Sequence, residues 1–550
     1  MNEASLPAPR RRVGSFLSGV SLLTASAVVV KLIGLAYRIP MLRVLGTEGM
    51  GYFNTAYEVY AFLCVLSTAG LPVAMSVLIS GQAAGEDPAV IRALHRRVYR
   101  VSLAVFAVVG CAGMLCLLLP ARLWGELLGN PEAAACIRAV SPAVPAICLA
   151  GAVRGYFQGL SDMKPTAVSQ VIEALGKLVL GLTFAYLAAR QGADLPHTAA
   201  AAVLGLTVGT MAAALWLLCR KRREDRVTPQ DSLPQASPLP SRRSILRRLT
   251  AVALPVTLSA GVISLTKCID LALILRRLQD AGLSAALANA AYGAYSTLAV
   301  PVFNILPSLS TSISVSLTPA LSSALARLRA GDDRDTALTE AREAVTRGLG
   351  LTLFFAVPAG LGLCVLGGDV LTLLFRGQPA AVAEATPWLQ ILGLSVPSAC
   401  LITVTGAMLQ AVGHPAVPIG STLIGTVAKA LLEYRLLADP AWGLTAAPLS
   451  SLVCDSLILL CNALSLAHRA PEIFPRTSRL LGLFTLPILL SLPALWGGAR
   501  LCGRLGITGS SGGAILCRIG SVVGLYAVGM ALLGLLYHKE RNLHHVGQTV

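Results

Sequence analysis

The amino-acid sequence predicts an all-α protein that crosses a membrane about fourteen times. Three observations predict this fold class: the composition, the length of the apolar segments, and the distribution of lysine and arginine between them. Of the 550 residues, 55% are hydrophobic and 13% are charged, whereas soluble proteins carry about 25% charged residues. This composition excludes a water-soluble enzyme. No polar stretch reaches the roughly 50 residues that a separate soluble domain needs.

A helix that spans the hydrocarbon core needs roughly 20 apolar residues, and fourteen segments meet this length. The first follows three arginines and resembles a signal peptide, but its apolar run continues to Tyr37. Because that is too long for a cleaved signal, we expect a spanning helix instead. In chain order, the windows are 14–37, 52–82, 98–120, 137–160, 166–189, 198–219, 249–275, 288–318, 345–367, 386–412, 416–437, 442–467, 480–499 and 513–537.

The basic residues alternate between the two sides of this predicted topology. The segments on the side of the N-terminus hold most of them, whereas the opposite loops hold few; the clusters lie near 92–100, 220–248, 327–347 and 469–479. Lysine and arginine accumulate in cytoplasmic loops, so both termini are predicted to be cytoplasmic and the protein to lie in the cytoplasmic membrane. The same rule accounts for the net charge of +17, and we expect no nucleic-acid partner.

The two halves of the chain resemble each other in sequence. The matches are displaced by 236, 248 and then 252 residues, and include Lys31 with Lys267, Gly46 with Gly282, Gly129 with Gly377, Pro131 with Pro379, and Lys177 with Lys429. Such a series predicts two parallel six-helix repeats with the substrate site between them. The predicted parts are an N-terminal lobe (1–219), a basic cytoplasmic linker (220–248), a C-terminal lobe (249–467) and a last segment with two further helices and a cytoplasmic tail (468–550).

Charged side chains inside the predicted spans are the candidates for a functional site. Each costs about 2.5–3.5 kcal/mol to insert, so such residues face a protein interior or a wet cavity. Lys31 and Arg38 share a helical face, and their window contains no acid; Glu58 of the next window is the nearest candidate partner. Unpaired cations suit a phosphate-bearing substrate, which arginine binds in a bidentate manner. The predicted substrate-binding cations are Lys31, Arg38, Arg43, Arg154, Lys177, Lys267 and Lys429, with Asn54, Glu58, Gln170 and Glu173 as polar residues of the cavity.

Several of these charges also have a purely structural explanation. The pairs Glu173–Lys177, Lys267–Asp270 and Lys429–Glu433 are three or four residues apart and could neutralise each other within one helix. Arg43 and Arg154 could instead extend to a membrane interface. Asp270 and Asp455 are the candidate residues for ion coupling.

The sequence contains no signature of catalysis. It has no G-x-x-x-x-G-K-[ST] nucleotide loop and no H-E-x-x-H zinc motif. The 13 cysteines lie singly and form no C-x-x-C, so we expect neither a metal nor a cofactor. Whether Cys502 and Cys517 pair across a predicted outer loop stays open. A transporter without a nucleotide site would be driven by an ion gradient or the membrane potential.

Four short segments carry a family resemblance: 30–40 (VKLIGLAYRIP), 67–74 (STAGLPVA), 154–159 (RGYFQG) and 165–170 (PTAVSQ). They resemble the stage V sporulation protein B group of polysaccharide transporters. This group belongs to the MOP exporter superfamily, which includes the MurJ-like lipid II flippases.

The resemblance implies a V-shaped pair of six-helix lobes that open alternately to each face of the membrane, with two extra helices that can hold a lipid tail. It also implies that Lys31 and Arg38 bind the pyrophosphate of the substrate, and that Arg43 matches an arginine at the end of the same helix. The eighth window lacks the arginine found there in MurJ-like flippases, for which Lys267 and Lys429 are candidate replacements.

The leading hypothesis is therefore a flippase, not an enzyme. Its substrate would be an undecaprenyl-pyrophosphate-linked oligosaccharide, with the peptidoglycan precursor lipid II as first candidate, for synthesis of the cell wall or spore cortex. Its partners would be this lipid-linked glycan, membrane lipids and cell-wall synthases. Two alternatives remain at this point: a cation-coupled multidrug exporter of the same superfamily, which would need a cavity dominated by acids, and a sporulation membrane scaffold that transports nothing.

Overall fold

The computed structural model describes residues 10–80, 88–227, 240–330, 334–475, 477–505 and 511–547. These ranges contain helices and no strand, which confirms the all-α class. Residues 228–239 of the predicted linker (220–248) lie outside them, whereas 220–227 belong to the helix that ends at Val227 and 242–248 to the helix that begins at Arg242. The helices are α1 (Arg10–Thr68), α2 (Gly70–Ser80), α3 (Pro88–Leu118), α4 (Ala121–Leu127), η1 (Pro131–Ala133), α5 (Ala134–Val140), α6 (Ala143–Gly159), α7 (Lys164–Arg190), α8 (Leu195–Val227), α9 (Arg242–Asp280), α10 (Ala285–Ala294), the π-turn η2 (Tyr295–Ala299), α11 (Val300–Ala330), α12 (Arg334–Leu374), α13 (Pro379–Val412), α14 (Ala416–Leu436), η3 (Gly443–Thr445), α15 (Ala446–Arg469), α16 (Thr477–Arg504) and α17 (Gly512–Gly547).

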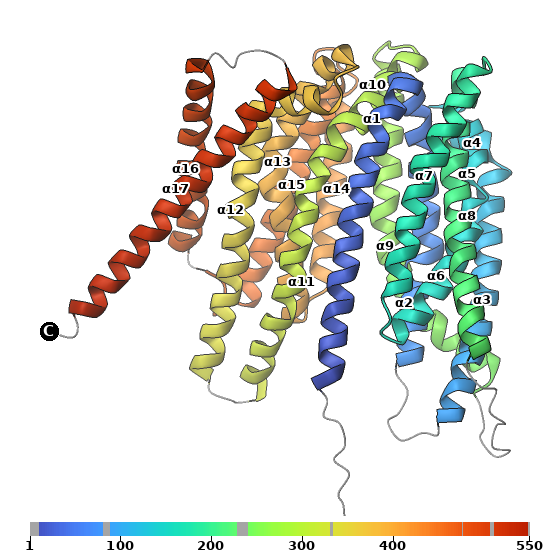
Figure 1. Cartoon of the computed structure of the whole chain (residues 1–550), viewed down its shortest axis with the longest axis horizontal. Coiled ribbons are helices and arrows are strands. Elements are labelled where there is room, and N and C mark those ends of the chain that lie inside the picture. The colour runs from blue at the N-terminus through green and yellow to red at the C-terminus, as the bar shows by residue number, and fades with distance from the viewer. Residues whose placement is uncertain are drawn as a thin grey trace, which may run out of the picture. The chain divides into compact units, whose positions relative to one another are not determined.

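The long α1 is a helical hairpin that turns at Gly46. This residue has φ 63° and ψ −176°, a non-helical conformation between two helical limbs. The rings of Tyr37 and Phe53 lie 5.9 Å apart, whereas sixteen residues of straight helix would separate them by about 24 Å. The two limbs therefore pack side by side, and Figure 1 shows the blue helix turning back at one end of the bundle.

The number of candidate spans agrees roughly with the predicted fourteen. Twelve described helical runs are long and apolar enough to cross a membrane, or thirteen if the pair bent by 40° at the α5–α6 junction is one span. The first run, Ala25–Ser80, includes the α1 hairpin. The predicted windows 14–37 and 52–82 thus lie on opposite sides of Gly46.

Contacts between helices divide the chain into two compact units, Met1–Gly293 and Ala294–Val550. α9 and nearly all of α10 pack in the first unit, although the sequence repeat assigns them to the second lobe. The predicted lobes follow sequence similarity rather than contacts, and that division stays a prediction.

Two pairs of turns support the internal repeat. Asn130 and its counterpart Gln378 each precede a proline. Asn130 has φ −140° and ψ 70°, and Gln378 has φ −137° and ψ 61°. Gly46 and Gly282, which also correspond, have positive φ values of 63° and 98°. The two halves are therefore alike at these two positions, whereas they differ at Gly129, which has φ 74° while the corresponding Gly377 does not have a positive φ.

In the first unit, glycines allow α7 and α8 to approach closely. A Cβ atom on Gly205 would lie 2.2 Å from the backbone nitrogen of Gly181, and one on Gly176 would lie 2.5 Å from the Cα of Gly209. Small residues at such crossings are typical of membrane helices, which associate through close packing of their backbones. This contact holds α7 in place, and α7 also packs against α1.

The second unit has its core between α11, α12, α13 and α15, where Leu321, Leu353 and Met408 are among the buried residues. The helices α16 and α17, red in Figure 1, pack against each other and against α12. Arg518 of α17 forms an ion pair of 2.9 Å with Asp369 of α12. Cys502 and Cys517 are both free thiols.

The turn at Gly46 leads to a prediction about stability. Its φ and ψ lie in a region that is essentially restricted to glycine and costs other residues about 1–3 kcal/mol, so Gly46→Ala should lower the midpoint of thermal unfolding. Gly34→Ala is the matched control, because Gly34 lies within a helical limb and a Cβ atom at either glycine would have no neighbour within 4 Å. The control should be neutral or slightly stabilising. Equal midpoints for the two variants in detergent would contradict a backbone constraint at Gly46.

Candidate functional site

Most of the predicted intramembrane charges lie in the first unit, on α1, α6, α7 and α9. Lys31 and Arg38 are on the first limb of α1, while Asn54 and Glu58 are on the second limb. The turn at Gly46 therefore brings charges from two predicted windows to neighbouring helices. The remaining members of the group are Arg154 of α6, Gln170, Glu173 and Lys177 of α7, and Lys267 and Asp270 of α9.

Arg154 forms an ion pair between helices instead of extending to an interface. Its Nη2 lies 3.1 Å from Oε2 of Glu173, and its Nε donates a hydrogen bond of 2.9 Å to Oγ of Ser169. The side chains of Arg154 and Glu173 are 13% and 26% exposed. Glu173 therefore neutralises an arginine of α6, and not only the lysine one turn away on its own helix.

Lys177 is surrounded by three aromatic rings of the α1 hairpin. Its Nζ lies 5.1 Å from the ring centroid of Tyr37, 5.4 Å from that of Phe53 and 4.7 Å from that of Tyr57. A cation within about 6 Å of an aromatic face is stabilised by the ring quadrupole, more strongly where water is excluded. We call these three rings the aromatic cage. They stabilise the ammonium group without cancelling its charge.

Arg38 and Lys267 both have Glu58 as an electrostatic partner. Glu58 interacts with Lys267 and Arg38 and also with Asp270. Arg38 additionally interacts with Tyr57 and with Tyr292 of α10. Glu58, which the sequence offers as a partner for Arg38, is therefore one of the groups whose charge acts on Arg38.

Together these side chains form one chain of charges through the first unit. Lys177 is attracted by Glu173 and repelled by Arg38, so it lies between the Arg154–Glu173 pair and the group around Glu58. The charge chain, in order, is Arg154, Glu173, Lys177, Arg38, Glu58 and then Lys267 with Asp270. Four cations meet three carboxylates, which leaves an excess of positive charge when all are ionised. Such a group can attract an oxyanion.

Four other predicted residues lie on α1 and α7. Lys31 and Arg43 are exposed on the first limb of α1, and Lys31 is on the same helical face as Arg38. Asn54 is buried with 4% of its surface exposed, and Gln170 is partly buried on α7.

The second unit contains a separate polar group on α14 and α15. Lys429 lies 3.6 Å from Glu433, which is one turn further along the same helix. This is the pairing within one helix that the sequence offers as a structural explanation for both charges. Glu433 is fully buried and accepts a hydrogen bond of 2.9 Å from Oγ of Ser450. Asp455 of α15 interacts electrostatically with Lys429. This group therefore combines two carboxylates with one ammonium.

Sequence reasoning missed the aromatic cage, although the sequence contains a signal for it. Aromatic residues make up only 5% of the chain, yet five of them lie within eleven residues between Tyr52 and Phe62. Two of these, Phe53 and Tyr57, contact the lysine together with Tyr37. Their common target could not be identified without knowing that α1 folds back on itself.

Comparisons with known proteins agree with this architecture. Residues 16–325 match a family model described as polysaccharide biosynthesis protein, and residues 285–435 match the MatE family model. The chain is similar to stage V sporulation protein B of Bacillus subtilis, with 24% identity over 464 residues that cover 83% of this chain and 84% of that protein. It is also similar to the lipid II flippase MurJ of the same organism, with 25% identity over 439 residues that cover 76% and 77% of the two chains.

A solved structure titled lipid II flippase MurJ, inward closed conformation, matches the fold with a TM-score of 0.69. The match covers 93% of this chain and 98% of that one at 13% identity, so it shows the fold alone. These matches confirm the resemblance found in the sequence and a multi-pass membrane protein of the transporter type rather than an enzyme.

The effect of burial on stability can be tested by comparing the Arg154–Glu173 ion pair with an exposed ion pair of similar length. Removing one partner of a largely buried pair costs about 3–5 kcal/mol because it leaves an uncompensated charge, so Arg154→Ala should lower the thermal unfolding midpoint strongly. Arg122→Ala removes a pair of 3.0 Å whose side chains are 79% and 50% exposed, and should cost less than about 1 kcal/mol. Replacing both Arg154 and Glu173 by Met should recover much of the loss. If the two single variants unfold at the same temperature, the pair on α6 and α7 is not a structural requirement.

Proposed function

Because this chain belongs to the polysaccharide biosynthesis protein family, whose relatives are membrane transporters, we propose that it is a flippase for an undecaprenyl-pyrophosphate-linked oligosaccharide. Lipid II is the first candidate substrate, since a similar protein bears the name lipid II flippase MurJ. The observation that carries the proposal is the excess of positive charge in the charge chain of the first unit. A pyrophosphate headgroup is the anionic part of such a substrate.

The proposed mechanism separates the two parts of the substrate. The prenyl tail stays in the lipid, and the polar headgroup crosses in a cavity that opens alternately to each face of the membrane. Lys31 and Arg38 bind the pyrophosphate, with Arg43 at the end of the same helical limb. Arginine supplies two parallel hydrogen bonds to phosphate oxygens, and lysine supplies a compact charge. Lys177, Lys267 and Arg154 add positive charge within the first unit, where Asn54, Glu58, Gln170 and Glu173 orient these cations. Lys429 is the proposed substrate-binding cation of the second unit.

The driving force would come from an ion gradient or the membrane potential. The sequence has no nucleotide-binding loop, and one charge crossing 100 mV gains about 2.3 kcal/mol. Asp270, an electrostatic partner of Glu58, and Asp455, a partner of Lys429, are the proposed ion-coupling residues. The distribution of basic residues supports a location in the cytoplasmic membrane with both termini in the cytoplasm. Cell-wall synthases that consume the flipped substrate are the proposed protein partners.

Genetic complementation tests the role of the two cations on α1. Expression of the wild-type chain should restore growth of a bacterial strain depleted of its lipid II flippase, whereas a variant with Lys31→Ala and Arg38→Ala should fail. The expected failure follows from loss of the groups that bind the pyrophosphate. Growth is measured at equal membrane levels of the proteins, determined by immunoblotting.

The matched control carries Arg190→Ala and Arg500→Ala, which also removes two positive charges. Arg190 and Arg500 stack on the rings of Tyr186 and Trp496 at 4.8 and 4.0 Å, apart from the charge chain. This control should restore growth as well as the wild type. Equal growth with the Lys31/Arg38 variant would refute the cationic mechanism, and failure of the wild type would refute lipid II as the substrate.

A multidrug exporter is the second candidate, and the MatE match over 285–435 favours it. Glu433 and Asp455 of the second unit are the carboxylates that a cationic drug would need. In this case, expression of the chain should reduce accumulation of ethidium in cells, and Asp455→Asn should abolish the effect. Accumulation that stays at the level of cells without the protein would exclude this candidate.

A further inference from the structure

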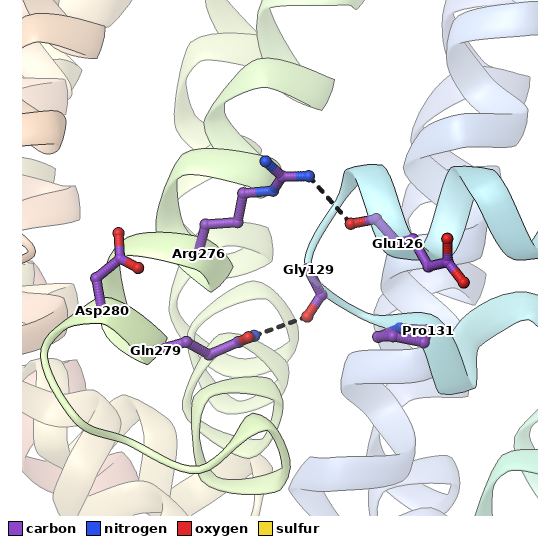
Figure 2. Close-up of a pocket in the computed structure, with 6 residues that line it drawn as sticks. All are labelled: Glu126, Gly129, Pro131, Arg276, Gln279 and Asp280. Carbon is purple, nitrogen blue, oxygen red and sulfur yellow. Dashed lines mark hydrogen bonds between the residues drawn. The ribbon is translucent and has the colours of Figure 1, made fainter.

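A pocket of about 430 Å³ lies at the end of α9, away from the charge chain. It is bounded by the turn between α4 and η1 on one side and by the last turn of α9 on the other, as Figure 2 shows. All of its residues belong to the first unit: Glu126, Gly129, Pro131, Arg276, Gln279 and Asp280. None of them is among the predicted substrate-binding residues.

The guanidinium group of Arg276 is the cation of this pocket, and most of its donors are not used by the protein. Its Nη2 donates one hydrogen bond of 3.1 Å to the backbone oxygen of Glu126. Within the described part of the chain, no carboxylate lies within ion-pair distance of Arg276. Figure 2 shows that the carboxylate of Glu126 points away from it. A guanidinium group has five N–H donors, so four are available to a ligand.

The two acids of the pocket are neutralised by other arginines. Glu126 forms an ion pair of 3.0 Å with Arg122, and Asp280 forms one of 2.9 Å with Arg277. Among the described residues that line the pocket and their ion-pair partners, Arg276 is therefore the arginine that has no carboxylate partner. An anion bound there would not have to displace an existing ion pair.

The wall of the pocket is held rigidly by the turn at Gly129 and Asn130. Gly129 has φ 74°, and its backbone oxygen accepts a hydrogen bond of 2.7 Å from Nε2 of Gln279. The buried side chain of Asn130 donates to Thr55 at 3.0 Å and to Asn289 at 2.8 Å. The turn is thus tied to α1, α9 and α10, and it fixes the position of the pocket relative to Arg276.

The location of these arginines needs an explanation other than topology. In the predicted orientation, the ends of α3 and α9 face the outside of the cell, where arginine and lysine are depleted. Arg122, Arg276 and Arg277 nevertheless gather there. The rule that explains the basic cytoplasmic segments therefore does not explain this group.

We propose that this pocket is a binding site for a phosphate-type oxyanion, with Arg276 as its principal ligand and the amide of Gln279 beside it. A forked guanidinium group matches the geometry of phosphate oxygens. The phosphate could come from two sources on the outer side: the pyrophosphate of a substrate after its translocation, or the headgroup of an anionic phospholipid. The first source rests on the proposed function, whereas binding of the oxyanion does not.

Calorimetric titration with inorganic pyrophosphate tests the site in the full-length protein. The protein is placed in phosphatidylcholine nanodiscs and carries Lys31→Ala and Arg38→Ala, so that the proposed substrate site does not contribute. Saturable binding should persist in this background and weaken at least tenfold with Arg276→Ala. The conservative Arg276→Lys should weaken it severalfold, because lysine keeps the charge and loses the fork. Arg190→Ala, an exposed arginine on the same predicted side, should leave the affinity within twofold.

Two outcomes would overturn the site: no saturable binding in the background variant, or binding that Arg276→Ala leaves unchanged. A second titration in nanodiscs with phosphatidylglycerol separates the two sources. If phosphatidylglycerol weakens the binding of pyrophosphate and this effect is lost with Arg276→Ala, the pocket binds the lipid headgroup. If phosphatidylglycerol leaves the binding of pyrophosphate unchanged, the substrate pyrophosphate is the source. Since this readout does not involve transport, it can succeed even if the complementation experiment fails.

Discussion

The cost of placing ions in hydrocarbon governs the arrangement of the first unit. Each charge inserted into a membrane needs a partner or a polar surrounding, and the protein meets this need by linking its charges in series. Arg154 has a carboxylate, Lys177 has aromatic faces and Glu58 has cations on two sides. Because the series contains like-charged neighbours, Lys177 with Arg38 and Glu58 with Asp270, as well as opposite charges, no single residue can be assigned an independent energy. The positive excess is a property of the whole group.

The hairpin of α1 makes this series possible. Without the turn at Gly46, Arg38 and Glu58 would lie about 30 Å apart on one straight helix, and the rings that surround Lys177 would not converge. A glycine with an unusual backbone conformation therefore determines where charges meet, although it contacts none of them. The close crossing of α7 and α8 has a similar role, since it holds the helix that carries Glu173 and Lys177.

Composition and the length of apolar segments were sufficient to predict the all-α membrane fold, because both follow directly from the thickness of the hydrocarbon core. The intramembrane charges were equally visible, since they are exceptions to an apolar background. The interaction partners of these charges could not be identified from the sequence. Glu173 has Lys177 one turn away, yet its ion-pair partner is Arg154 on another helix, and only the tertiary structure decides between the two. The aromatic cage and the pocket at Arg276 depend on the folding back of α1 and on the turn at Gly129, neither of which leaves a periodic signal in the sequence.

Lys177 and Lys429 occupy corresponding places in the internal repeat but are stabilised in different ways. The first is surrounded by three ring faces, and the second lies 3.6 Å from a buried carboxylate. The two halves of the repeat therefore differ in the surroundings of this lysine. Two lysines at corresponding positions of the repeat therefore have neighbours of different character, a group of aromatic rings for one and a buried carboxylate for the other.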